Sequence, residues 1–142
     1  MGIGKVFVHG DFWAANFLWN DDTLVKIVDF QMSHFGLAAT DLTRLFNTCL
    51  SPADRRAKWQ TYLKFYHDQL TKEFQGHKIP FTYQQLEKTY KLVYPRTSAL
   101  LLPALLATLQ TLTKSEAAEE QKTVTAKLIL EKIVGIYVDI LA

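Results

Sequence analysis

The chain has 142 residues, of which 49% are hydrophobic and 21% are charged. These proportions are typical of a globular chain and exclude a disordered tail, a collagen-like repeat and a coiled coil. Sixteen lysines and arginines against fourteen aspartates and glutamates leave a net charge of +2, which is too small to indicate a nucleic-acid partner. The longest apolar run, residues 99–107, contains Pro103 and is far shorter than the roughly 20 residues that cross a bilayer, so we expect no membrane span.

The chain contains one cysteine, Cys49. A single cysteine cannot form an internal disulfide, so we expect a reducing, cytoplasmic location. Cys49 falls on the apolar face of an expected helix, which predicts a small, buried hydrophobic side chain there.

The first 36 residues have the pattern of short strands. Residues 5–8, 16–19 and 24–28 are alternating or β-branched runs. The Asn-Asp-Asp sequence at 20–22 predicts a hairpin turn, because these residues tolerate the backbone angles of tight turns. We therefore expect one strand, a loop over 9–15 and then a hairpin that ends at Asp29.

From Asp41 onward the apolar period changes to about 3.6 residues, which is typical of helices. Ser51-Pro52 and Thr82 with Gln85 have the sequence of helix starts. The Leu-rich stretch 97–112 predicts a buried helix, with a kink at Pro103 left open. We expect about five helices and an α+β fold that is mostly α, the helices beginning near 41 and covering 51–70, 82–94, 97–112 and 116–141.

Three polar side chains near the expected strands have the chemistry of phosphoryl transfer. Asp11 follows the first strand, Asn16 lies five residues later, and Asp29 ends the hairpin. Such transfer needs one carboxylate at the acceptor hydroxyl, and oxygen ligands for the Mg²⁺ that neutralises the nucleotide phosphates. The order indicates Asp11 as the base, with Asn16 and Asp29 as metal ligands, all at one edge of the strands.

The segments HGDFWAANFLW (9–19) and KIVDFQ (26–31) resemble the catalytic loop and metal-binding motif of the choline kinase and aminoglycoside phosphotransferase superfamily. Trp13 and the Asp-Phe-Gln triplet are similar to the CHK kinase-like branch, also called ecdysteroid-kinase-like. The resemblance continues through Gly36 and Asp41-Leu42 and fades beyond about Tyr66.

The resemblance implies a role for each matching residue. It makes Asp11 the catalytic acid/base, and Asn16 and Asp29 the metal ligands. It gives His9 a structural role in the catalytic loop, and it makes Asp41 the acceptor of hydrogen bonds that hold the loop in place.

The resemblance also implies a protein-kinase-like C-terminal lobe. Only eight residues precede His9, so we expect residues 1–142 to form this lobe without the N-terminal lobe that clamps the nucleotide. The expected partners are Mg²⁺, ATP and a small-molecule alcohol such as a sterol or an amino alcohol. We expect little or no transfer by this lobe alone; the alternative is a non-catalytic interaction module or pseudokinase fragment with a partner protein covering the exposed lobe face.

Two further features have competing interpretations. His34 could face an acceptor substrate, although a plain loop residue is the simpler interpretation. Trp59, Tyr62 and Tyr66 could form an aromatic cage for a quaternary ammonium, but their helical spacing favours the core of the fold.

Overall fold

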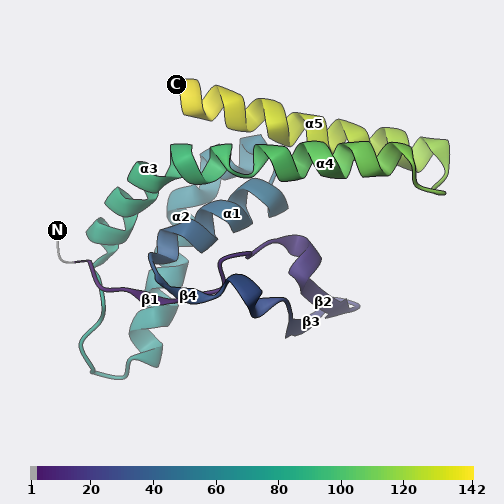
Figure 1. Ribbon diagram of the computed structural model, residues 1–142. Helices are drawn as coiled ribbons and strands as arrows, with labels where there is room; N and C mark the ends of the chain where they lie inside the picture. Colours follow the sequence, from purple (N-terminus) through teal and green to yellow (C-terminus); the bar gives the residue numbers. More distant parts are fainter. Residues whose placement is uncertain (1–2) are drawn as a thin grey trace.

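Two small antiparallel sheets form the N-terminal part of the computed structural model, which describes residues 3–142 (Figure 1). Strand β1 (Val6–Val8) pairs with β4 (His34–Gly36), and Phe7 lies opposite Phe35. Strands β2 (Phe17–Asn20) and β3 (Thr23–Ile27) form a hairpin. The first strand and the hairpin are confirmed.

The sequence predicts that the first strand and the hairpin share one edge, at which Asp11, Asn16 and Asp29 lie. The structure corrects this prediction, because β1 and the hairpin belong to separate sheets. The partner of β1 is β4, a strand that the sequence pattern did not predict. It contains His34, which is therefore a strand residue and not a loop residue. Three residues are too few for an alternating pattern, so β4 is defined by its pairing rather than by its own sequence.

Five α-helices follow, as predicted. The Ser51 side chain accepts the N–H of Asp54 at the start of the second helix, and Thr82 and Gln85 form a capping box at the third, so both helix starts are confirmed. The helices are α1 (Ala38–Cys49), α2 (Pro52–Glu73), α3 (Tyr83–Ala99), α4 (Leu102–Thr113) and α5 (Glu119–Leu141).

The main hydrophobic core surrounds α1. Helices α1, α2 and α3, with Phe81 just before α3, contribute its buried side chains, and Trp59, Tyr62 and Tyr66 pack against it. The three aromatic residues therefore belong to the core, as their spacing indicates. The buried members are Ala38, Ala39, Leu42, Phe46, Leu63, Phe81, Leu86 and Tyr90.

Helices α4 and α5 run side by side and extend away from this core (Figure 1). Leu105 of α4 packs against Ile129, Ile133 and Ile136 of α5. Within α4, Leu105 is the only buried residue. The prediction of a buried Leu-rich helix over 97–112 is therefore wrong: α5 covers one face of α4, and the other faces are exposed.

The helix boundary in this region also differs from the prediction. Helix α3 continues through Pro95 to Ala99, and Pro103 lies in the first turn of α4, where its missing N–H is not needed. In the described part of the chain no single helix is long and apolar enough to span a membrane. Helices α3 and α4 taken together have the length and apolar composition of a membrane span, but the pair is bent by 41°.

Cys49 is exposed, so the prediction of a buried thiol is wrong. Cys49 is the last residue of α1. A position at the end of a helix is not covered by the neighbouring helices even where the apolar pattern continues to it.

Candidate active site

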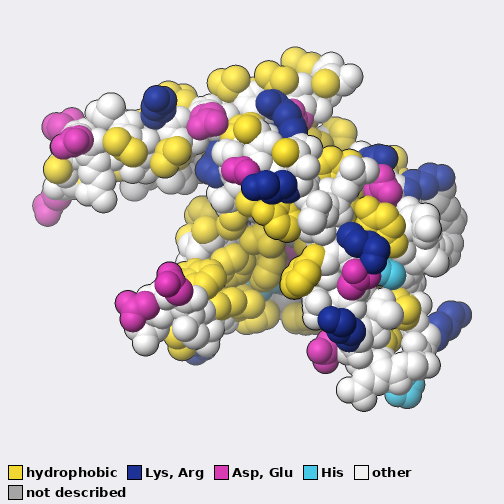
Figure 2. All heavy atoms as spheres, turned by 180° about the vertical axis from the view of Figure 1, so that it is seen from behind, with side chains coloured by type: hydrophobic (Ala, Val, Ile, Leu, Met, Phe, Trp, Pro, Cys, Tyr) yellow, Lys and Arg dark blue, Asp and Glu magenta, His cyan; other side chains and the backbone are white. Residues whose placement is uncertain are grey.

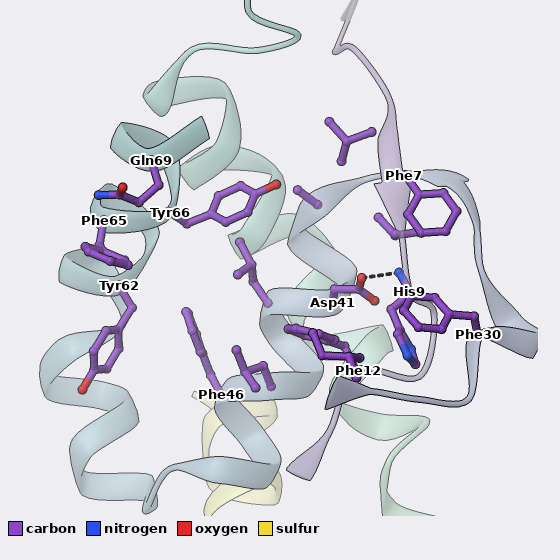
Figure 3. Close-up of a pocket in the computed structure, with 16 residues that line it drawn as sticks. Phe7, His9, Phe12, Phe30, Asp41, Phe46, Tyr62, Phe65, Tyr66 and Gln69 are labelled. Atoms are coloured by element: carbon purple, nitrogen blue, oxygen red, sulfur yellow. Dashed lines mark hydrogen bonds between the residues drawn. The ribbon is translucent and has the colours of Figure 1, made fainter. Parts of the chain in front are cut away.

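Asp41 holds the loop that follows β1. Its Oδ2 accepts the backbone N–H of His9 at 2.6 Å (Figure 3). Its Oδ1 accepts the backbone N–H of Gly10 at 3.0 Å. Asp41 lies in the first turn of α1, where a negative charge is favourable. Two charge-assisted hydrogen bonds therefore fix the loop to a rigid helix.

Gly10 allows the loop to turn at this point. Its φ is +81°, and a Cβ added there would lie 2.2 Å from the backbone oxygen of Met32. Both the left-handed backbone and the close approach require glycine.

His9 connects the loop to the segment before Asp29. The ring is buried, with 4% of the residue surface exposed. Its Nε2 lies 2.9 Å from the carbonyl oxygen of Val28, so Nε2 carries the proton and donates. Its Nδ1 accepts the backbone N–H of Asp11 at 3.2 Å. The two ring nitrogens therefore link Asp11 to the residue next to Asp29.

The structure brings the side chains of Asp11 and Asn16 into contact. The Asn16 Nδ2 donates to the backbone oxygen of Asp11 at 2.8 Å and to its Oδ2 at 3.2 Å. Asn16 is 7% exposed, and within residues 3–142 its Oδ1 accepts no hydrogen bond. Because Asp11 holds Nδ2, the amide oxygen Oδ1 is the atom of this side chain that remains for a ligand.

A backbone hydrogen bond joins the segment that carries Asp29 to Asn16. The N–H of Val28 donates to the Asn16 carbonyl oxygen at 3.0 Å, and Asp29 is the next residue after Val28. Asp29 is exposed and has the left-handed angles φ 66° and ψ 57°, which are uncommon outside glycine. In the described part of the chain its carboxylate makes no hydrogen bond to Asp11 or Asn16.

These oxygens have the chemistry that Mg²⁺ prefers. No group of three or more His, Cys, Asp or Glu side chains in residues 3–142 is arranged to hold a metal ion, and the set here instead joins an amide oxygen to carboxylates. The Asn16 Oδ1 and the Asp29 carboxylate are hard ligands without competing hydrogen bonds, and Mg²⁺ is usually held by only one or two carboxylates together with phosphate oxygens. The residues therefore fit such an ion.

Arg44 is a site residue that the sequence analysis missed. Its NH1 lies 2.7 Å from Oδ1 of Asp11, and each of the two side chains is about a quarter exposed (24% and 25%). Arg44 follows Asp41 by three residues on α1, so both side chains share the helix face that meets the loop. That spacing is the signal that could have identified it.

An apolar cavity of about 490 Å³ lies beside the loop. Phe7, His9 and Phe30 line one side, and Tyr62, Phe65 and Tyr66 of α2 line the other (Figure 3). Figure 2, which shows the molecule from behind relative to Figure 1, has a hollow lined by hydrophobic side chains next to the hairpin. Burial, with the negative charge of Asp41, raises the pKa of Tyr66, so this phenol stays neutral beside the loop.

Comparison with known proteins gives two matches. A family model described as "DUF1679: Uncharacterized oxidoreductase dhs-27" matches residues 1–142. The "Uncharacterized kinase-like protein D1044.1" of Caenorhabditis elegans is 36% identical over 93 residues, which are 64% of this chain and 24% of that protein. The chain thus spans about a quarter of the length of the curated relative that it matches. No solved structure matches the chain.

Proposed function

Since the chain belongs to the DUF1679 family and is similar to a kinase-like protein, we propose that it forms the catalytic-loop lobe of a kinase-like phosphotransferase. Within this proposal it is a member of the CHK kinase-like branch and uses ATP to phosphorylate an alcohol. The observation that carries the proposal is the hydrogen-bonded pair of Asp11 and Asn16, joined through Val28 to Asp29.

The family description also contains the word oxidoreductase. The common nucleotide fold of redox enzymes binds its cofactor at the carboxyl ends of parallel strands. In residues 3–142 the strands pair only antiparallel and in twos. We therefore base the proposal on the kinase-like relative.

In the proposed reaction Asp11 receives the proton of the acceptor hydroxyl. The hydroxyl oxygen forms a bond to the γ-phosphorus of ATP, the bond from that phosphorus to the β,γ-bridging oxygen breaks, and ADP leaves with the electron pair. The Asp11 carboxylate has about four lone-pair sites. Arg44 and Asn16 occupy two of them, which leaves room for the hydroxyl.

The other residues of the site position these groups. His9 and Asp41 hold the loop backbone, so that Asp11 and Asn16 project from a fixed frame. Asn16 and Asp29 would hold Mg²⁺, which when bound supplies positive charge against the phosphates. Most of the catalytic gain in phosphoryl transfer comes from such positioning and charge.

The metal site can be tested without measuring turnover. Mn²⁺ with ATP, added to the ¹⁵N-labelled chain, should broaden the backbone signals of Asn16 and Asp29 first. Asp29→Asn should abolish this broadening. Asp21→Asn is the matched control, because Asp21 is also exposed and left-handed (φ 49°) but lies at the turn of the same hairpin. Broadening centred on residues 21–22, or none at millimolar Mn²⁺ and ATP, would refute the proposed metal ligands.

We expect the 142 residues by themselves to transfer phosphate slowly or not at all. The resemblance covers the catalytic loop and the metal motif, whereas kinase-like enzymes also use a phosphate-covering loop and a strand lysine. Phosphates held from one side are less well positioned. A phosphate-transfer assay at a rate near that of two-lobed kinases would contradict this expectation.

The apolar cavity favours a second function, a non-catalytic module that binds an apolar protein segment. Phe7 and Phe65, on opposite walls, are 58% and 63% exposed, and contiguous exposed apolar surface marks binding sites. A thermal shift separates the two functions. ATP with Mg²⁺ at about a hundred times Kd stabilises the nucleotide-binding fold by about 2.7 kcal/mol, whereas a chain that is only a module shows no shift at millimolar nucleotide.

A further inference from the structure

Helix α5 has two apolar sides, and only one of them is covered in the described part of the chain. Three isoleucines on the covered side pack against Leu105 of α4. A second row of apolar side chains, which we call the outer row, lies on another side of the helix, and each member is about half exposed or more. The outer row consists of Leu130, Val134, Tyr137 and Leu141. Its spacings of four, three and four residues are those of the contact positions in a pair of packed helices.

The outer row is open to a second helix. On a further side of α5, Asp139 binds Arg55, and a Cβ added at Gly135 would meet Pro52, so this side faces α2. Helices α4 and α2 therefore occupy two sides of α5, and the outer row lies on the side that remains. The first half of α5 also extends beyond the core (Figure 1), so it can be approached without obstruction from the body of the chain.

Two opposite charges lie beside the outer row in a shallow groove that α5 forms by itself. The groove is lined by Thr123, Ala126, Lys127, Leu130, Glu131 and Val134. Lys127 and Glu131 are one turn apart and both are exposed, and within residues 3–142 neither takes part in an ion pair. A charged residue at a contact position between helices fixes the register in which they pair.

This charge pattern is complementary to itself when two copies of α5 run in opposite directions. A parallel pair would place Lys127 against Lys127 of the second copy, which is repulsive. In an antiparallel pair with its two-fold axis near Ile129, Lys127 of each copy lies beside Glu131 of the other. Because α5 spans Glu119–Leu141, this axis is close to the midpoint of the helix, and the two helices overlap along most of their length.

We propose that the chain forms a symmetric dimer through this face, in which the second copy presents its own α5 in the antiparallel direction. The Leu130 side chains of the two copies meet near the axis, between the two pairs of Lys127 and Glu131. Burial of the outer row supplies the attraction, and the charges fix direction and register. The dimer goes beyond the proposed phosphotransferase function and does not depend on it.

Sedimentation equilibrium of the 142-residue chain tests the proposal, and two leucines of α5 provide matched variants. Leu130 and Leu128 are 48% and 52% exposed, but they lie about 200° apart around the helix. The unsubstituted chain should be a dimer. Leu130→Glu should be a monomer, because it places two carboxylates together near the axis. Leu128→Glu should remain a dimer.

Charge exchange tests the direction of the two helices. Lys127→Glu and Glu131→Lys should each raise the dimer Kd about tenfold or more, because a symmetric contact contains every changed charge twice. An equimolar mixture of these two variants should form a heterodimer, since opposite charges then meet again, and the double variant should dimerise like the unsubstituted chain. Recovery in the mixture shows that both single variants are folded.

Three results would overturn the proposal. The first is an unsubstituted chain that stays monomeric up to millimolar concentration. The second is a dimer that survives Leu130→Glu and dissociates with Phe65→Glu, because the contact would then lie at the apolar cavity beside α2. The third is a dimer whose Kd is unchanged by either single charge exchange, which is the behaviour of a parallel pair or of a contact elsewhere.

Discussion

The carboxylate of Asp41 accepts the backbone N–H of His9 at 2.6 Å, across 32 positions of sequence. The same carboxylate accepts the N–H of Gly10 through its other oxygen. One helix residue thereby fixes the start of the loop that carries Asp11 and Asn16. The geometry of the candidate site therefore depends on a side chain that contacts neither the proposed metal nor the proposed acceptor.

Asp41→Asn should loosen this loop. The asparagine side chain has a single acceptor oxygen, so one of the two backbone N–H groups faces an NH₂ group instead. Hydrogen bonds to a charged group contribute about 1.5–3 kcal/mol, and we expect a loss of that size in the free energy of unfolding by urea. Hydrogen exchange at His9 and Gly10 should also accelerate.

Asp68→Asn is the control for Asp41→Asn. Asp68 pairs with Lys64 on the exposed surface of α2, where such pairs contribute less than about 1 kcal/mol. Equal urea midpoints for the two variants would contradict the importance assigned to Asp41.

Gly10→Ala should destabilise the chain more than Gly76→Ala. Both glycines are left-handed, with φ of +81° and +87°, but an added Cβ meets the Met32 oxygen at Gly10 and nothing within 4 Å at Gly76. Left-handed backbone alone costs about 1–2 kcal/mol for alanine. The steric clash at Gly10 adds about 1–3 kcal/mol, and thermal or urea unfolding of both variants measures the difference. If both variants lose the same free energy of unfolding, the backbone at Met32 moves without appreciable cost to accommodate the Cβ added at Gly10.

Asp139→Asn should be among the most destabilising substitutions in the helical part. The Asp139 carboxylate accepts from Arg55, Arg56 and the Tyr94 hydroxyl. Arg55 is 2% exposed, and breaking a buried ion pair by removing one partner costs about 3–5 kcal/mol. Urea unfolding measures the loss. Glu119→Gln, which removes an exposed partner of Lys122, is the control and should change little.

Asp139 should also make the stability depend on acid pH. Burial by itself would raise its pKa, but the hydrogen bonds from Arg55 and Arg56 outweigh burial and lower the pKa below its usual range. The folded state then binds this proton less readily than the unfolded state, whose pKa is about 3.9. The stabilisation is present above pH ~4 and is lost as the pH falls through the lower folded pKa. The urea midpoint of Asp139→Asn should therefore change less with acid pH than that of the unsubstituted chain.

At alkaline pH, Tyr94 should have the opposite dependence. Burial raises the pKa of Tyr94 to about 12, against about 10 in the unfolded chain. The stabilisation from the neutral phenol is present below pH ~10 and is lost as the pH rises towards 12. Urea unfolding at pH values between about 10 and 12 measures this loss of stability, and Tyr94→Phe should reduce it. Tyr137→Phe, which changes an exposed ring, is the control. If the free energy of unfolding of Tyr94→Phe falls as steeply with rising pH as that of the unsubstituted chain, burial does not raise the pKa of the Tyr94 phenol.

The sequence by itself determined the local structure of this chain. The strand at β1, the turn between β2 and β3, and the starts of α2 and α3 follow from residues that lie within a few positions of one another. Turn residues, caps and apolar periodicity act over one or two turns of backbone, so their effects can be predicted without knowing the fold. The three candidate residues Asp11, Asn16 and Asp29 were also selected at this level.

Only the tertiary structure decided which of these parts meet. The pairing of β1 with β4, the ion pair of Arg44 with Asp11, the exposure of Cys49 and the open faces of α4 all depend on segments far apart in the sequence. An apolar pattern shows which face of a helix can be buried, but burial also needs a neighbour, and the position of that neighbour is set by the packing of the whole chain.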